Sequence, residues 1–277
     1  MDAMGTNSQP QDMEIATDDQ TKVIKDILIG DVWLCSGQSN MDLQIGQLTP
    51  KGQLPYAAIQ DNAQIRYFGV PCSYAETPQE HFSKATYWSV PSSVEILKYS
   101  AYAYSFAASL QQETGVPIGI IDSSYGGTAI QHWLSEEALA KAGTRYNESM
   151  YNSMIAPIKS FPIKGILWYQ GESNIQQTLS YTKLFQEYVA LYREIFHDEQ
   201  LPIITTQLPR YNGAEYPKWA DFRLEQWDIA SRMEQVEIVC GIDLGEANQL
   251  HPSDKYVFGN RAGQLTLNKV YHLDFPG

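Results

Sequence analysis

The sequence is short of positive charge, and this shortage excludes two classes of partner. Its 277 residues contain 19 Lys and Arg against 32 Asp and Glu, which gives a net charge of −13. Nucleic acids and anionic membranes bind basic surfaces, so neither is an expected partner. An anionic small substrate is still compatible with this charge, because one or two arginines bind a carboxylate. The candidates are Arg66, Arg145, Arg210 and Arg223.

Cysteine is also scarce. The chain has only Cys35, Cys72 and Cys240, and no CxxC motif. An odd number without that motif predicts neither a disulfide framework nor a metal site, and we expect no metal and no cofactor. Cys35 and Cys240 each end an apolar, strand-like run, which favours buried free thiols over the alternative of one disulfide.

Long apolar runs are missing as well. No stretch is long enough to span a membrane, and residues 1–22 contain no apolar run of the kind that a signal peptide needs. These residues are polar and acidic, so we expect a disordered leader, either a cloning remnant or the trimmed start of a longer protein. Residues 23–277 show no internal repeat or low-complexity linker, which predicts one domain.

What the sequence does contain is an alternation of short apolar runs with longer helical patterns. The compact apolar runs are typical of strands that are buried on both faces of a parallel sheet. The alternation predicts an α/β fold with helices on both faces of that sheet. Expected strands are 27–35, 64–70, 117–122, 165–169, 202–207 and 236–241, and expected helices are 100–112, 179–196, 217–233 and 253–267.

The strongest chemical feature is the run Ser36–Met41, SGQSNM, directly after the strand that ends in VWLC. A Gly-flanked turn between a strand and a helix presents a side chain at the carboxyl edge of the sheet, where ligands bind in open α/β folds. Ser39 in that turn is a candidate nucleophile. Its own N–H, at a helix start, points to where an oxyanion would sit.

Two later strands end in loops with matching chemistry. Gly126 and Gly127 follow the strand PIGIID, and glycine lets a backbone N–H approach an oxyanion closely. Gln170 and Glu172 follow the strand GILWY. The Gln170 amide is a candidate oxyanion donor, and for Glu172 we favour a structural role in the site over proton transfer.

A serine hydroxyl is a weak nucleophile and needs a base within hydrogen-bond reach. Among the 5 histidines, His251 lies in a loop between an expected strand and an expected helix, with acidic residues just upstream. Because the unperturbed pKa of histidine lies near 6.5, His251 is the candidate base.

Together these motifs resemble the SGNH hydrolase superfamily, and within it the carbohydrate esterases that include sialic-acid-specific 9-O-acetylesterases. The matching stretches span residues 30–256 in the expected order. They are GDVWLCSGQSNM, SSYGGTAIQHW, WYQGESN and LHPSDK.

The resemblance implies a flavodoxin-like, three-layer α/β/α fold and a serine esterase that removes acetyl groups from a sugar without a metal. It implies Ser39 as nucleophile, His251 as base, and an oxyanion hole formed by the Ser39 N–H, the Gly127 N–H and the Gln170 side chain. Gln38, Asn40 and Glu172 are further candidates in the oxyanion and substrate-binding group. The implied substrate is 9-O-acetylated sialic acid, with acetylated xylan as the alternative, and the implied location is periplasmic or secreted. A non-catalytic sugar-binding module is the alternative from another class.

The sequence departs from the family pattern beside the histidine. Many relatives have Asp three or two residues before it, where this chain has Asn248 and Gln249. A neutral neighbour does not stabilise the imidazolium as a carboxylate does. Three interpretations stay open: a Ser–His pair whose histidine is held by a backbone carbonyl, which we prefer; recruitment of Asp243 or Glu246; or an impaired enzyme.

Overall fold

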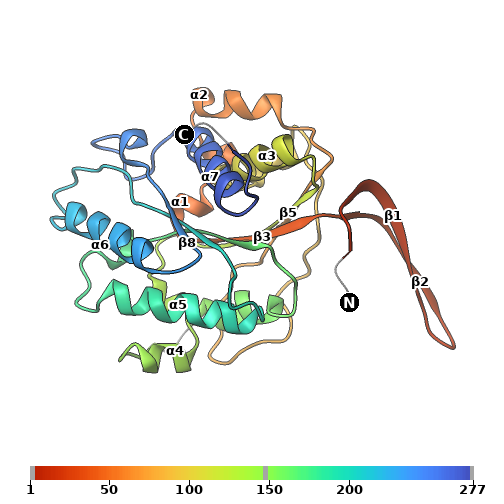
Figure 1. Ribbon diagram of the computed structural model, residues 1–277, viewed down its shortest axis with the longest axis horizontal. Helices are drawn as coiled ribbons and strands as arrows, with labels where there is room; N and C mark the ends of the chain where they lie inside the picture. Colours follow the sequence, from red (N-terminus) through yellow and green to blue (C-terminus); the bar gives the residue numbers. More distant parts are fainter. Residues whose placement is uncertain (1–3, 146–148, 275–277) are drawn as a thin grey trace.

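The computed structural model describes residues 4–145 and 149–274, and its centre is a parallel sheet of six strands (Figure 1). The order across the sheet is β4-β5-β3-β6-β7-β8. The strands are β3 (Asp31–Gly37), β4 (Ile65–Gly69), β5 (Ile118–Ser124), β6 (Gly165–Tyr169), β7 (Ile203–Thr206) and β8 (Val236–Val239). The first strand in the chain, β3, is therefore central, and later strands add on either side of it.

Helices cover both faces of this sheet, which confirms the predicted three-layer α/β/α fold. In Figure 1, α3 and α7 lie on one face, and α4 and α5 lie on the other. The helices are α1 (Ser39–Asp42), α2 (Pro50–Gln53), α3 (Ala101–Thr114), α4 (Glu136–Lys141), α5 (Tyr181–Ile195), α6 (Trp219–Arg232) and α7 (Lys255–Lys269).

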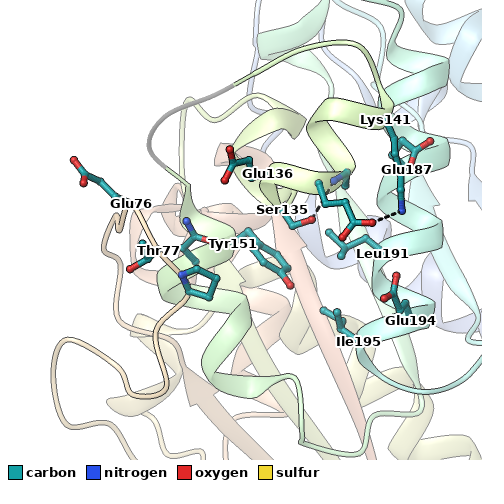
Figure 2. A pocket seen from close by; sticks show the side chains of 14 residues that line it. Glu76, Thr77, Ser135, Glu136, Lys141, Tyr151, Glu187, Leu191, Glu194 and Ile195 are labelled. Carbon is teal, nitrogen blue, oxygen red and sulfur yellow. Dashed lines mark hydrogen bonds and ion pairs between the residues drawn. The ribbon is translucent and has the colours of Figure 1, made fainter.

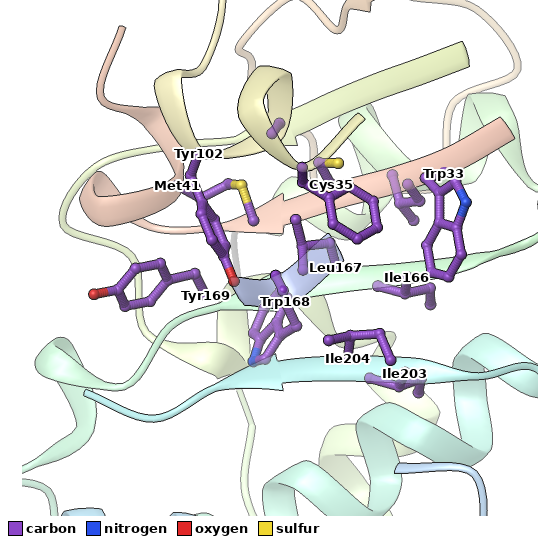
Figure 3. Packing of buried hydrophobic residues seen from close by; sticks show 14 of the residues in the cluster. Trp33, Cys35, Met41, Tyr102, Ile166, Leu167, Trp168, Tyr169, Ile203 and Ile204 are labelled. Carbon is purple, nitrogen blue, oxygen red and sulfur yellow. The ribbon is translucent and has the colours of Figure 1, made fainter. Parts of the chain in front are cut away.

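The central strands are mostly apolar because both of their faces are covered. Every residue of β6 is buried, and on neighbouring β3 Trp33, Leu34 and Cys35 are fully buried. Figure 3 shows how the side chains of these two strands pack with Ile203 and Ile204 of β7. All three cysteines are free thiols; Cys35 is buried, whereas Cys240 is only partly buried.

Two glycines bring α7 unusually close to α3. A Cβ atom at Gly259 would lie 1.8 Å from Ser105 Oγ, and one at Gly263 would lie 2.5 Å from Ser109 Oγ. Larger residues at these positions would push the helices apart. The close contact fixes α7 against the sheet, and with it the loop that enters α7 from β8.

The expected disorder of residues 1–22 is wrong for most of that segment. β1 (Asn7–Ala16) and β2 (Thr21–Ile29) form an antiparallel hairpin that projects from the three layers as an arm (Figure 1). Met13 and Ile15 alternate with polar neighbours in β1, whereas apolar residues are adjacent in β2, and Met13 pairs with Ile24 across the strands. The prediction was wrong because residues 1–22, which include the exposed and mostly polar β1, have the composition of a disordered segment.

Two helix starts also differ from expectation. The helix expected over 253–267 begins at Lys255, and its N-cap is Asp254, whose side chain accepts a hydrogen bond from the Val257 N–H. Ser253 Oγ instead donates to Glu246 Oε1. Pro217 lies one residue before the N-cap of α6 and not in its first turn.

Candidate active site

The turn after β3 lies between the carboxyl ends of two neighbouring strands. Gly37 is in register with Ser124 of β5 and with Tyr169 of β6. The residue has a φ of +141°, and a Cβ atom there would lie 2.1 Å from the Tyr169 carbonyl oxygen. Only glycine fits this backbone and this approach. The turn thus sits at the point where the strand order reverses, the usual ligand site of an open α/β sheet.

Ser39 and His251 meet above this turn. Ser39 is the first residue of α1 and is half-buried. Its Oγ lies 2.8 Å from His251 Nε2, although the two residues are 212 positions apart in the chain. In the tautomer with the proton on Nδ1, Nε2 accepts the hydroxyl proton, as a general base requires.

The electrostatic surroundings keep His251 neutral. Partial removal of the ring from water, and then the positive charge of Lys255, hold the pKa of His251 below its ordinary value of 6.5. A neutral imidazole is the form that accepts a proton.

Neither acidic candidate reaches the His251 ring. Both oxygens of Asp243 accept hydrogen bonds from Arg261, at 2.6 and 2.8 Å, and this contact lowers the pKa of Asp243 to about 2. Glu246 accepts from Ser253. Within the described ranges, no hydrogen bond joins His251 to a carboxylate. The interpretation that recruits Asp243 is therefore contradicted, because Arg261 on the next helix holds that side chain.

The glycine loop after β5 lies against the nucleophile. A Cβ atom at Gly126 would lie 3.5 Å from Ser39 Cβ. The Gly126 N–H donates to Asp42 Oδ2 at 3.2 Å, so a carboxylate of α1 fixes the loop. Gly127 follows with a φ of +78° and is exposed. In the described residues the N–H groups of Ser39 and Gly127 have no hydrogen-bond acceptor, which leaves both for an oxyanion.

The predicted oxyanion donor Gln170 lies in a buried network of side-chain amides. Its side chain is fully buried, and its Nε2 lies within hydrogen-bond distance of Gln38 Oε1, the Thr128 carbonyl and Asn174 Oδ1. Gln38 is buried too, and its Oε1 also accepts from the backbone N–H groups of Gly171 and Ser173. Both amides thus bind the loops of the site to each other. In this structure the Gln170 amide is engaged with three protein acceptors, and its role as an oxyanion donor stays a prediction.

Asn40 and Glu172 lie behind the nucleophile, out of contact with solvent. Asn40 Nδ2 donates to Glu172 Oε1 at 2.5 Å and to the Leu250 carbonyl at 3.1 Å. Lys255 Nζ donates to Asn40 Oδ1 at 2.6 Å. Burial raises the pKa of the Glu172 carboxyl and lowers that of Lys255 to about 7. Neither Gln38, Asn40 nor Glu172 therefore has the exposure that a substrate contact needs.

Two residues of this site were not predicted from the sequence. Asp42 follows Ser39 by three positions. An acidic residue in the first turn of the helix that begins at Ser39 was the available signal. Lys255 stands four residues after His251 and is fully buried. It ends the matching stretch LHPSDK, and that resemblance was the available signal for it.

The arginines considered for an anionic substrate are mostly engaged elsewhere. Arg66 pairs with Asp26, and Arg223 donates to the Leu208 carbonyl. Arg210 Nε donates to the Gly245 carbonyl, which places this arginine beside the loop after β8.

A separate cavity of about 410 Å³ lies between α4, α5 and the segment 76–78 (Figure 2). Its lining includes Glu136, Glu187 and Glu194, and the Lys141–Glu137 ion pair stands at its side. None of the residues described above lines it, so the cavity is not the nucleophile site. In the described parts of the chain, no group of three or more His, Cys, Asp and Glu side chains is placed to hold a metal ion, and no helix is long and apolar enough to cross a membrane.

Comparison with known proteins gives consistent results. Residues 29–266 match the family described as carbohydrate esterase, sialic acid-specific acetylesterase. The sialate O-acetylesterase of Pongo abelii is 35% identical over 196 residues, covering 63% of this chain and 37% of that protein. A carbohydrate acetylesterase from Xanthomonas citri has a TM-score of 0.89 at 29% identity, covering 99% of this chain and 64% of the other.

A solved protein from Arabidopsis thaliana shares the fold, with a TM-score of 0.63 at 19% identity; the match covers 87% of this chain and 99% of that one. The coverage differs among these relatives. The chain spans about a third of the Pongo abelii enzyme and just under two thirds of the Xanthomonas citri enzyme.

Proposed function

The chain belongs to the carbohydrate esterase family of sialic acid-specific acetylesterases, and from this premise we propose that it hydrolyses O-acetyl esters on a carbohydrate by a Ser–His mechanism. The observation that supports the mechanism is the 2.8 Å contact between Ser39 Oγ and His251 Nε2 at the carboxyl edge of the sheet. A hydroxyl beside a neutral imidazole is the arrangement that activates serine as a nucleophile.

In the proposed reaction, Ser39 Oγ attacks the acetyl carbonyl carbon while His251 Nε2 takes the hydroxyl proton. The carbonyl oxygen becomes an oxyanion, and the N–H groups of Ser39 and Gly127 stabilise it. His251 then gives the proton to the departing sugar oxygen, which leaves an acetyl group on Ser39. Water, activated by the same histidine, hydrolyses this acyl-enzyme to acetate and free Ser39.

A Ser–His pair without a carboxylate fits the surroundings of His251. The positive imidazolium forms only while the oxyanion exists, so the negative oxyanion is its nearest opposite charge. The partly exposed ring also keeps contact with solvent, which moderates the cost of the transient charge.

For the substrate, we propose sialic acid acetylated at its 9-hydroxyl, because the matched family and the Pongo abelii relative are both described by this sugar. Acetylated xylan is the alternative within the same chemistry. A non-catalytic sugar-binding module is the alternative of another class, and the preserved contact between Ser39 and His251 argues against it.

The test is acetate release by the purified chain from 9-O-acetylated sialic acid and from acetylated xylan, with p-nitrophenyl acetate as a general ester. We expect hydrolysis of the general ester and preference for the sialic acid. Preference for xylan would replace the substrate while keeping the mechanism. Glycan binding without hydrolysis of any ester would refute the proposed activity.

A further inference from the structure

The Asn40 amide connects four parts of the chain at one buried point. Asn40 is fully buried, and its oxygen accepts from Lys255 Nζ at 2.6 Å. Its nitrogen donates to Glu172 Oε1 at 2.5 Å and to the Leu250 carbonyl at 3.1 Å. The partners come from the start of α7, from the loop after β6 and from the loop after β8.

The positions of these partners in the chain link the two proposed catalytic residues. Asn40 follows Ser39 directly, and Leu250 directly precedes His251. The hydrogen bond from Asn40 Nδ2 to the Leu250 carbonyl therefore joins the backbone beside the base to the side chain beside the nucleophile. In the described residues, this bond, the Lys255–Asn40 hydrogen bond and the Ser39–His251 contact join the nucleophile turn to the residues around His251.

Lys255 and Glu172 determine which way the amide faces. The oxygen and nitrogen ends of an Asn side chain have nearly the same shape, so their partners decide the orientation. A lysine ammonium only donates, and an ionised carboxylate only accepts. Lys255 on one side and Glu172 on the other hold Nδ2 toward the Leu250 carbonyl, which also only accepts. A flipped amide would face Lys255 with a donor and Leu250 with an acceptor.

We propose that Asn40, oriented by Lys255 and Glu172, is the positioning residue that holds His251 at Ser39 in place of the carboxylate of a triad. The inference rests on the proposed function, since it assigns a role within the same site. It explains how a histidine without an acidic partner keeps its distance from the nucleophile. It also explains why two ionisable side chains are buried behind the turn, where burial is costly unless each charge has a partner.

The charges around this group are few. Lys255 faces Glu172, through the amide, and the Asp254 carboxylate at the start of its own helix; both favour its charged form. Lys255 in turn is the charge that lowers the pKa of His251. The start of α7 is held in place by Ser105 of α3, whose Oγ lies 3.2 Å from the Lys255 carbonyl oxygen.

The first test replaces the amide with a group of the same size. Asn40→Asp puts an oxygen in place of Nδ2, so that acceptors face each other at Glu172 and at Leu250. We expect kcat for p-nitrophenyl acetate to fall about 10²-fold with KM unchanged, because misplacement of a base by an ångström has a cost of this order. Asn62→Asp is the matched control, since Asn62 Nδ2 bonds Gln111 at the opposite edge of the sheet. It should keep the wild-type kcat.

If Asn40→Asp does not fold, a second pair of variants at Glu172 tests the same proposal. Glu172→Gln keeps an oxygen that accepts from Asn40 Nδ2, whereas Glu172→Leu removes it. With folding checked by circular dichroism, we expect Glu172→Gln to retain most of kcat and Glu172→Leu to lose about as much as Asn40→Asp. Equal kcat in the two variants would overturn the proposal, and so would a loss that falls on KM alone.

A pH profile separates positioning from mere stability. Lys255→Met removes the positive charge that lowers the pKa of His251, so the acid limb of kcat/KM should move to higher pH. A purely structural lysine would lower the melting temperature without moving that limb, and this outcome would count against the proposal. If the wild type itself hydrolyses no ester, the proposed function fails; if the wild type is active and Asn40→Asp is equally active, only this inference fails.

Discussion

The nucleophile turn and the loop that supplies its base are held in very different ways. In Ser36–Met41 every residue except Ser39 is buried, whereas Glu246–Gln249 of the base loop are all exposed. The turn bonds to the flanking strands on both sides. Ser36 Oγ donates to the Ser123 carbonyl at 2.6 Å, and the Gln38 N–H donates to the Tyr169 carbonyl at 3.0 Å.

The base loop has fewer connections, and most of them lie far from Ser39. The Asn212 N–H donates to the Ala247 carbonyl, and Ser253 bonds Glu246 within the loop itself. Separate sets of contacts therefore hold Ser39 and His251 in place. Packing and strand register place the nucleophile, while a few polar contacts bring the base to it.

Removing either Ser39 or His251 should have the largest effect, because the proposed mechanism needs both side chains however each is held. We expect Ser39→Ala and His251→Ala each to lower kcat on the order of 10⁴–10⁶-fold, and the double variant to be little worse. Initial rates on p-nitrophenyl acetate measure this. Full activity of Ser39→Ala would exclude the serine mechanism altogether.

A substitution among the buried residues that hold the nucleophile turn should mainly lower the stability of the fold, with a smaller effect on the rate of hydrolysis. Gln170→Ala removes a buried amide with three acceptors around it, and we expect a loss of about 1–3 kcal/mol in the free energy of unfolding. Urea denaturation measures this change. A 10²–10³-fold loss of kcat at unchanged stability, as for an oxyanion donor, would show instead that Gln170 turns toward the substrate.

The exposed base, His251, should determine the pH dependence of the reaction. Only neutral His251 accepts the serine proton, and its pKa is held below 6.5, so the neutral form persists into mild acid. We therefore expect kcat/KM to fall in acid with a slope of one proton and a midpoint below the ordinary histidine value of 6.5. A midpoint above the ordinary histidine value would mean that a carboxylate stabilises the imidazolium.

The smallest effect should come from Asp243, an acidic residue eight positions before the base. Asp243→Asn breaks an exposed ion pair with Arg261, and such pairs contribute little to stability. We expect unchanged kcat and a nearly unchanged melting temperature. A loss on the order of 10⁴-fold, as the loss of a triad carboxylate causes, would place Asp243 in the reaction after all.

The sheet was predictable because its strands are buried on both faces. The predicted strand 165–169 matches β6 residue for residue, since a continuous apolar run between polar loops has few other interpretations. The hairpin β1–β2 was missed for the converse reason. Its first strand, β1, is exposed and mostly polar, so it has the composition of a disordered tail.

The site was predictable where a motif follows a strand, and not where contacts cross the fold. Ser39 and the glycine loop lie at strand ends, so parallel register brings them together. By contrast, Asp243 is close to His251 in sequence and yet bonds Arg261, one turn and a half along α7. The acceptors around Gln170 come from three separate loops, and no local sequence pattern predicts that these loops meet.

Because Ser39 and His251 are far apart along the chain, ester hydrolysis by this pair would appear only once the chain has folded completely. The pair closes a loop of 212 residues, and the entropy of that closure is offset only once α7 has docked on α3. A refolding chain with its sheet formed but α7 undocked would hold a nucleophile without a base. Recovered ester hydrolysis would then time the last long-range step, while the circular dichroism of the sheet and helices times the earlier ones.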